Sequence, residues 1–306
     1  MDESAYLSVS VVIPVYNDAE RLQKCLRALE QQTYPRDRIE VIVVDNNSDD
    51  PQKTEQVVKA FENVRLVCEP TPGSYAARNR GIAQVRHEVV AFTDSDCIPA
   101  PNWIENGVRH LNETPNCGLV AGRVELFFRN PKKRSAVELY ESITAFPQQE
   151  FLEQLKGGAT ANVFTTQAVL DRVGSFNPQL KSFGDMDLGK RIFEAGYAQV
   201  YAEDTWVAHP ARYTFSQISQ HSIRVAGGVY DRFVGSQPSP SERDRVLAIV
   251  LRDDGILLWK RVMRALHDSR LKGWCQRLHV CVVAGWVFGV SVFEKLRLRF
   301  GGTSTR

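Results

Sequence analysis

The sequence predicts an α/β fold, in which a mainly parallel β-sheet is flanked by helices and followed by a helical C-terminal extension. Short apolar runs typical of buried strands alternate with helical patterns between residues 9 and 207, and this alternation is typical of right-handed βαβ units. Several of these runs end in acidic or polar residues. After residue 212 only helical patterns remain. We therefore expect two domains, residues 1–212 with the sheet and residues 213–306 with helices alone.

The first elements are the clearest. Val9–Val15 is nearly continuous in apolar residues, as expected for a strand that is buried on both faces. Asp18 can cap the helix that follows, and apolar residues from Leu22 to Leu29 mark one face of that helix. Ile39–Val44 repeats the strand pattern. The same patterns predict further strands at 64–67, from 89, at 118–128 and at 197–207, and helices at 52–61, 75–85, 102–111, within 137–151, at 166–173 and at 185–195.

Acidic residues follow two of the predicted strands. Asp45 comes after one apolar run, and Asp94 and Asp96 come after another. Asp94 and Asp96 face the same way if their strand persists to its tip, because side chains alternate along a strand. Ligands of open α/β sheets bind outside the carboxyl ends of the strands, and Mg²⁺ typically joins one or two carboxylates to substrate phosphates. A lone Asp-x-Asp is also common in solvated loops, so its meaning depends on the other motifs.

The composition excludes several classes of protein. A net charge of +2 argues against an electrostatic nucleic-acid binder, so we expect no nucleic-acid partner. The glycine motifs of dinucleotide-binding enzymes and P-loop NTPases are absent. Six scattered cysteines contain no Cys-x-x-Cys pair and indicate reduced thiols. The acidic residues after Met1 lack the basic start of a signal peptide. We expect a cytoplasmic protein, either free or peripheral on the inner face of the cell membrane.

The C-terminal third contains one apolar segment. Leu278–Phe293 has sixteen residues, fewer than the roughly twenty that cross a bilayer. Trp274 and Trp286 accompany it, and the basic residues Arg277, Lys295, Arg297 and Arg299 flank it. A packed helix, a helix in the plane of the membrane and a short span all remain open. Flanking cations and tryptophans favour contact with a membrane surface through residues 273–299.

Five ordered motifs resemble one known family. They are Ser-Val-Val-Ile-Pro-Val-Tyr-Asn at 10–17, Val-Val-Asp-Asn-Asn-Ser-Asp at 43–49, Ala-Arg-Asn-Arg-Gly at 77–81, Phe-Thr-Asp-Ser-Asp at 92–96 and Gly-Asp-Met-Asp-Leu-Gly-Lys-Arg at 184–191. Their order resembles that of family 2 glycosyltransferases, which have the GT-A fold, a Rossmann-like α/β architecture. The resemblance covers residues 8–212 and does not extend to the C-terminal third.

The resemblance implies roles for matching positions. It implies that the nucleotide-sugar donor is bound by Pro14, Val15, Tyr16, Asp45, Arg78 and Asp94. It implies that Asp96 ligates Mn²⁺ or Mg²⁺, and His209 falls where some relatives have a metal or pyrophosphate contact. Asp185 matches the general base of an inverting transfer. From the residues alone, Asp185 is equally an N-cap of its helix.

Two departures from the family pattern refine these expectations. Gly184 replaces the acidic residue that often precedes the base. The Gln-x-x-Arg-Trp motif of processive synthases is absent, and the nearest approach, from Gln220 to Arg224, has the wrong spacing. We therefore expect transfer of a single sugar, from a UDP-linked donor to the hydroxyl of a glycan or a lipid-linked acceptor.

Three other functions are compatible with parts of this pattern. A nucleotidyltransferase of related architecture needs a glycine- and arginine-rich loop after the first strand, where this chain has Pro14-Val15-Tyr16-Asn17. A phosphatase that uses Asp94 as nucleophile expects Thr or Val at the position of Ile98. A catalytically inactive, membrane-associated scaffold with the same fold would not need its acidic residues, which are all retained.

Overall fold

The computed structural model describes residues 7–305, so the acidic N-terminus lies outside the described residues. The chain folds into two compact units that interleave in sequence. The first unit comprises residues up to Glu125, Phe146–Gln179 and Gly184–His209. The second comprises Leu126–Ala145, Leu180–Phe183 and the residues from Pro210 onward. The domain boundary that the sequence suggests at residue 212 stays a prediction.

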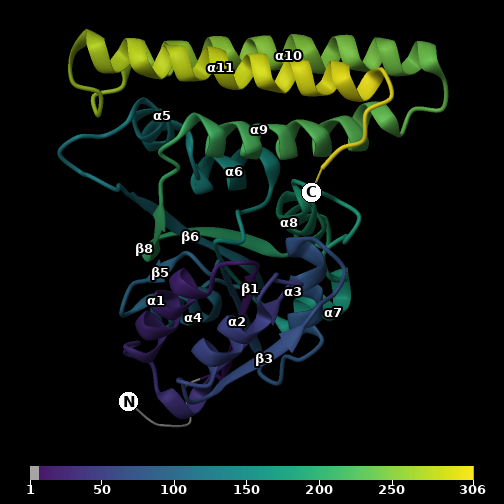
Figure 1. Ribbon diagram of the computed structural model, residues 1–306. Coiled ribbons are helices and arrows are strands. Elements are labelled where there is room, and N and C mark those ends of the chain that lie inside the picture. The colour runs from purple at the N-terminus through teal and green to yellow at the C-terminus, as the bar shows by residue number, and fades with distance from the viewer. Residues whose placement is uncertain (1–6, 306) are drawn as a thin grey trace. The chain divides into compact units, whose positions relative to one another are not determined.

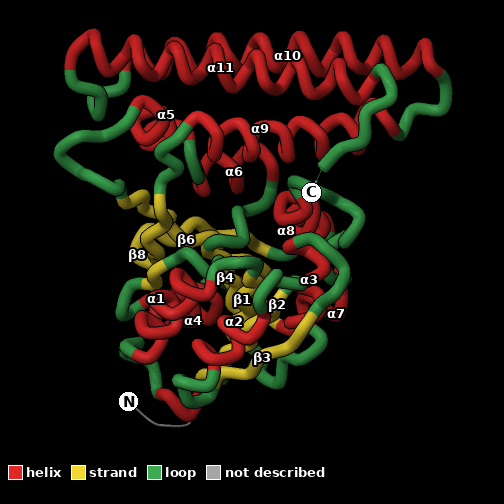
Figure 2. Tube along the Cα trace, in the orientation of Figure 1, coloured by secondary structure: helices red, strands yellow, loops and turns green. Residues whose placement is uncertain are grey.

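An eight-stranded mixed sheet, in the order β3-β2-β1-β4-β7-β6-β8-β5, forms the framework of the first unit (Figures 1 and 2). Strands β1, β2, β3 and β4 are parallel to one another, as the alternation of strands and helices predicts. Strand β7 is antiparallel to both β4 and β6, and β5 is antiparallel to β8. The strands are β1 (Val9–Val15), β2 (Ile39–Asp45), β3 (Val64–Cys68), β4 (Val89–Thr93), β5 (Ile98–Pro99), β6 (Cys117–Phe127), β7 (Asn162–Thr166) and β8 (Ala198–Pro210).

The helices follow the predicted pattern closely in the first half of the chain. Those that follow the first strands are α1 (Ala19–Glu30), the short 3₁₀-helix η2 (Arg36–Arg38), α2 (Pro51–Val58), α3 (Ser74–Ile82) and α4 (Trp103–Glu113). Later helices are α5 (Ala136–Thr144), α6 (Gln148–Leu155), α7 (Gln167–Val173), α8 (Gly184–Glu194), α9 (Phe215–Val229), the π-helix η3 (Tyr230–Gly235), α10 (Pro240–His267) and α11 (Gly273–Arg299).

Both faces of the parallel strands are covered by helices. Val9, Val11 and Ile13 of β1 join a core that includes apolar residues of α1 and α4. Val12 points the other way, and its side chain meets Gly81 of α3 so closely that a Cβ there would collide with it. Burial on both sides explains why these strands read as continuous apolar runs rather than as alternating ones.

The sequence did not predict β7. Asn162–Thr166 has only five residues and contains two threonines and an asparagine, so it lacks the apolar run that marked the other strands. Asn162 is fully buried, and its amide donates to the carbonyls of Arg123 and Thr205. These bonds satisfy a polar side chain inside the sheet, which a sequence pattern cannot show.

The second unit is helical apart from the strand ends that lead into it. Its core combines residues of α5, α9, α10 and α11, among them Tyr140, Ile218, Ala265, Val283 and Val287. Helices α10 and α11 pack along each other as a long pair (Figure 1). The apolar segment recognised in the sequence is the middle of α11, which has 27 residues. Among the described residues, α11 is long and apolar enough to cross a membrane by length and composition alone.

Candidate active site

The two acidic residues after β4 lie in a turn rather than on the strand. Strand β4 ends at Thr93, and the amide of Cys97 donates to the carbonyl of Asp94 at 3.0 Å. The strand therefore ends before Asp94 and Asp96, so alternation along a strand does not explain how these two residues are oriented. The turn brings their carboxylates together instead.

His209 reaches the same turn through a short antiparallel pairing. Ile98 of β5 pairs with Ala208 of β8, so the residue after Ala208 lies beside the turn. The Nε2 atom of His209 is 3.5 Å from Oδ1 of Asp96, and its ring packs on Phe146 at a centroid distance of 4.7 Å. One ligand atom from each of Asp94, Asp96, Cys97 and His209 lies within 4.8 Å of the others. The predicted metal residues thus form one cluster.

Arg21 and Asp18 lie beside this cluster, and the sequence did not predict that they contact it. Arg21 of α1 contacts Asp96 at 3.3 Å and Asp18 at 2.7 Å, so it bridges two carboxylates. The Asp18 side chain is thereby used for the site and not for the backbone cap that the sequence suggests. Burial raises the pKa of the Cys97 thiol well above its ordinary value, which favours the neutral thiol over a metal-binding thiolate.

Asp45 lies at the carboxyl edge of the sheet beside the end of β1. It pairs in register with Val15, so the segment Pro14-Val15-Tyr16 and Asp45 meet at one edge. Val15 is buried, whereas Tyr16 is 59% exposed. One carboxylate oxygen of Asp45 accepts the amide of Ser48 at 2.8 Å. The other, Oδ2, is buried and has no hydrogen-bond partner among the described residues.

Asparagines hold the loops around Asp45. The amide of Asn17 donates to Ser48 Oγ at 2.9 Å, and the Asn17 side chain exchanges two hydrogen bonds with Asp49, both 2.8 Å long. Asn46 donates to the carbonyls of Glu69 and Thr71 and accepts from the amide of Gly73. The loops that follow β1, β2 and β3 are therefore fixed to one another.

Helix α3 connects the acidic turn with Asp185. The buried guanidinium of Arg78 donates to Asp94 at 2.5 Å. Tyr75, three residues earlier and therefore on the same side of the helix, donates through its hydroxyl to Asp185 at 3.3 Å. The ring of Tyr75 is fixed by stacking on Phe176 at 5.6 Å. One helix face thus places Asp94 and Asp185 at the same edge of the sheet.

The position of Asp185 rules out its interpretation as an N-cap. Helix α8 begins at Gly184, so Asp185 lies inside the first turn, where its carboxylate also accepts the amide of Met186 at 3.1 Å. Burial raises the pKa of Asp185, while the charge of Arg78 and the hydrogen bond from Tyr75 oppose that rise. As a whole residue, Asp185 is half-buried.

Glycines let α8 approach its neighbours. A Cβ on Gly184 would lie 2.7 Å from the ring of Tyr75, which explains why glycine replaces the acidic residue expected there. A Cβ on Gly189 would meet the backbone of Lys156 and Gly157. The segment 157–162 is buried against α8 and the strands. Its glycines therefore allow close packing.

Comparisons with known proteins agree with this architecture. Residues 10–175 match the family model described as glycosyl transferase family 2. Glycosyltransferase AglE of Haloferax volcanii is 42% identical over 223 residues, which cover 72% of each chain. Pre-mycofactocin glycosyltransferase of Mycobacterium tuberculosis is 28% identical over 265 residues, which cover 83% of this chain and 52% of that longer protein.

Solved structures share the fold at low identity. The mannosyltransferase PcManGT from Pyrobaculum calidifontis, solved in complex with GDP-Man and Mn²⁺, superposes with a TM-score of 0.61 at 18% identity and covers 95% of this chain and 88% of its own. TarS of S. aureus superposes with a TM-score of 0.53 at 19% identity, and the match covers 79% of this chain and 42% of the TarS chain. The expected GT-A fold is therefore confirmed. The family match over more than half of the chain and the AglE relationship show that this chain belongs to glycosyltransferase family 2.

Proposed function

We propose that this glycosyltransferase moves a single sugar from a nucleoside-diphosphate sugar to an acceptor hydroxyl, with inversion at the anomeric carbon and Asp185 as general base. The observation that carries the proposal is the double contact of α3. Arg78 holds Asp94 in the acidic turn, and Tyr75 holds Asp185. A donor bound at the turn and a base beside it are what a single displacement requires.

Asp45 is suited to recognise the nucleoside. Its Oδ2 is buried and unsatisfied among the described residues, and such an acceptor costs free energy until a donor reaches it. The ring N–H of a uracil is a donor of the right kind. We therefore propose that the sugar donor is UDP-linked. In this proposal Tyr16 lies beside the uracil ring, and Pro14 and Val15 form the bottom of the nucleoside site. A guanine also offers N–H donors, so a GDP-sugar is the alternative that binding must test.

The acidic cluster fits a hard divalent cation, Mn²⁺ or Mg²⁺. Two carboxylates and an imidazole, from Asp96, Asp94 and His209, supply oxygen and nitrogen ligands within 4.8 Å of one another. Such an ion, when bound, would neutralise charge on the diphosphate leaving group. We propose Asp96 as its main ligand, His209 as a second contact, and Asp94, oriented by Arg78, as the contact to the ribose or the donor sugar.

Asp185 is suited to accept the acceptor's proton. Burial raises the pKa of Asp185 toward neutral pH. A general base is more effective when its pKa lies closer to the working pH, provided that it is still ionised. Its position in the first turn of α8 places it near the positive end of the helix dipole, which favours ionisation. Proton removal of this kind contributes about 10²–10⁴-fold to a rate.

Two variants separate donor binding from chemistry. Asp96→Ala is expected to abolish metal-dependent binding of UDP-sugars, and Asp185→Asn is expected to retain that binding but to lose at least about 10²-fold in turnover. Calorimetry with and without Mn²⁺, together with release of nucleoside diphosphate from a panel of nucleotide sugars, measures both. Asp187→Asn is the matched control for the base, because Asp187 lies in the same turn but pairs with Arg191. Normal turnover in Asp185→Asn would refute the base.

We propose a glycan or lipid-linked hydroxyl as the acceptor and a cytoplasmic enzyme, either free or held on the inner face of the membrane. The nucleotidyltransferase alternative is not supported, because the named relatives are glycosyltransferases. An inactive scaffold would have no reason to hold Asp45, Asp94, Asp96 and Asp185 at one edge of the sheet.

A further inference from the structure

Helix α11 exposes an apolar stripe on one side. Along its length, large side chains recur at intervals of four or seven residues, so they share one face. Two of them are almost fully accessible, with Trp274 78% and Phe293 68% exposed. The members of this stripe are Trp274, Leu278, Val282, Trp286 and Phe293. Five exposed apolar side chains on one helix face, without a charge among them, form a contiguous patch of the kind that marks an interaction surface.

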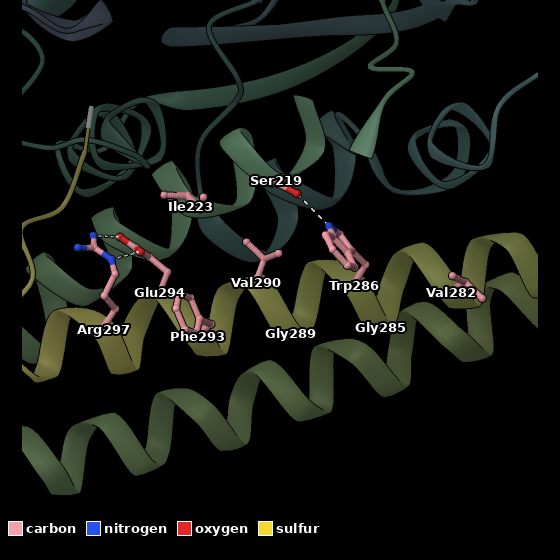
Figure 3. Close-up of a pocket in the computed structure, with 10 residues that line it drawn as sticks. All are labelled: Ser219, Ile223, Val282, Gly285, Trp286, Gly289, Val290, Phe293, Glu294 and Arg297. Carbon is pink, nitrogen blue, oxygen red and sulfur yellow. Dashed lines mark hydrogen bonds and ion pairs between the residues drawn. The ribbon is translucent and has the colours of Figure 1, made fainter. Parts of the chain in front are cut away.

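The stripe borders a groove between α9 and α11, which Figure 3 shows. The groove has a volume of about 870 Å³ and is lined mainly by apolar side chains, including Ile223 of α9 and Val290 of α11. Gly285 and Gly289 form part of the lining, and no described heavy atom outside their own helix lies within 4 Å of where their Cβ would be. Polar groups are confined to the Trp286–Ser219 hydrogen bond of 2.8 Å and a Glu294–Arg297 ion pair.

The opposite side of α11 packs within the second unit. Val283, Ala284 and Val287 are buried against residues of α5, α9 and α10. The ammonium of Lys295 is buried and bonds to Asp254 of α10 at 2.5 Å. Crossing a membrane would break this ion pair and leave charged groups in hydrocarbon, which is strongly unfavourable. The structure therefore favours a helix that lies parallel to a surface.

The charge of the two long helices indicates which surface that is. Residues 240–300 contain twelve Lys and Arg against six Asp and Glu, whereas the whole chain carries only +2. Basic residues next to exposed tryptophans are typical of helices that lie on anionic lipid. A second copy of this chain would carry the same positive charge and would be repelled.

We propose that the apolar stripe of α11 and the adjoining groove dock in the plane of an anionic lipid bilayer, with lipid chains entering the groove beside Gly285 and Gly289. This docking surface lies wholly within the second unit. It specifies the membrane location that is part of the proposed function, and its test is separate from the proposed reaction, since docking requires neither donor nor acceptor.

The test uses the full-length protein and vesicles of phosphatidylcholine, with or without phosphatidylglycerol. Gly289→Asp places a carboxylate in the groove, where the Cβ has room, so it is expected to weaken binding at least about tenfold without unfolding the protein. Gly255→Asp is the matched control, because Gly255 is a helical glycine of α10 with equal room and lies outside the stripe. Trp274→Ala removes a side chain that is 78% exposed, so the protein is expected to remain folded.

Flotation with the vesicles and quenching of tryptophan by brominated lipids give the readout. We expect binding that needs phosphatidylglycerol, weakens with salt and is quenched by bromines near the headgroups. Gly289→Asp and Trp274→Ala should lose binding, and Gly255→Asp should keep it. Quenching only by bromines at the bilayer centre would show a span and overturn the proposal. Failure of the wild type to bind, or a dimer that Gly289→Asp dissociates, would overturn it as well.

Discussion

Tyr75 and Arg78 determine the arrangement of the carboxylates on which the proposed chemistry depends. Arg78 is buried and balances the charge of Asp94, while Tyr75 contacts Asp185 through a neutral hydroxyl. Asp94 therefore pairs with a full positive charge, whereas Asp185 accepts a hydrogen bond from a neutral hydroxyl in a buried setting that raises its pKa. Two carboxylates in different surroundings can take different roles in one reaction.

This difference predicts a pH effect for Tyr75→Phe. A base works when ionised, so turnover falls as the pH drops through the pKa of Asp185. The tyrosine hydroxyl stabilises the ionised form. Removing it raises that pKa further, and the acidic limb of the turnover profile should move to higher pH. At high pH the variant should recover most of its turnover, because the ring that stacks on Phe176 remains.

The pH profile of turnover for wild type and variant measures this effect. Tyr34→Phe is a control, since Tyr34 is a buried tyrosine that donates to the carbonyl of Leu7, away from Asp185. An acidic limb that stays in place in Tyr75→Phe would contradict the link between Tyr75 and the base.

Single residues show which parts of the candidate site local sequence can indicate. Asp45, Asp94, Asp96 and Asp185 stand in short motifs that can be read from local sequence, and the structure places them along one edge of the sheet. Arg21 and Tyr75 were missed, because each acts on a residue 75 or 110 positions away. A contact of that range leaves no periodic signal, and Arg21 looks like any exposed arginine on a helix.

At the scale of elements, two antiparallel pairings complete the site. The parallel half of the sheet follows from alternating strands and helices, and it was predicted together with its helices. The two-residue strand β5 and the polar strand β7 were not, because neither has an apolar run of its own. Yet β5 brings His209 to Asp96, and β7 pairs Asn162 with Thr93 at the tip of β4.

Close packing of α8 predicts a cost for Gly189→Ala. The added methyl group would meet the backbone of Gly157 and the carbonyl of Lys156, and backbone cannot move aside as a flexible side chain can. Overpacking of this kind costs about 1–3 kcal/mol. Since α8 carries Asp185, its displacement should also reduce turnover.

Thermal melting and turnover of matched variants test this prediction. Gly255→Ala has open space around its Cβ and should be neutral or stabilising by up to about 1 kcal/mol, because alanine favours a helix. Equal stability and equal turnover of the two variants would show that the approach of α8 to the segment at Gly157 is not needed.

At the scale of the molecule, the two units alternate along the chain. Patterns of strand and helix suggest one boundary near residue 212, but Leu126–Ala145 and Leu180–Phe183 belong to the second unit. Sequence patterns identify element type and give no information about which distant helix an element packs on. The helix α5 shows this, since its residues join the core of α9, α10 and α11.

The segment 180–183 gives the last prediction, because it belongs to the second unit and leads directly into Gly184 and Asp185. Lys181 forms an ion pair with Asp231 at 3.0 Å and donates to the carbonyl of Ser304 at 3.1 Å. These bonds hold the segment 180–183 within the second unit, and the chain continues from that segment directly into α8. Lys181→Ala should therefore lower kcat by about three- to tenfold, a loss of roughly 1 kcal/mol, while donor affinity stays unchanged.

Lys190→Ala, which removes an exposed pair with Glu194 on α8 itself, should leave kcat unaltered. Steady-state kinetics with calorimetry of the donor separates the two effects, and an unchanged kcat in Lys181→Ala would show that Asp185 is positioned by the first unit alone.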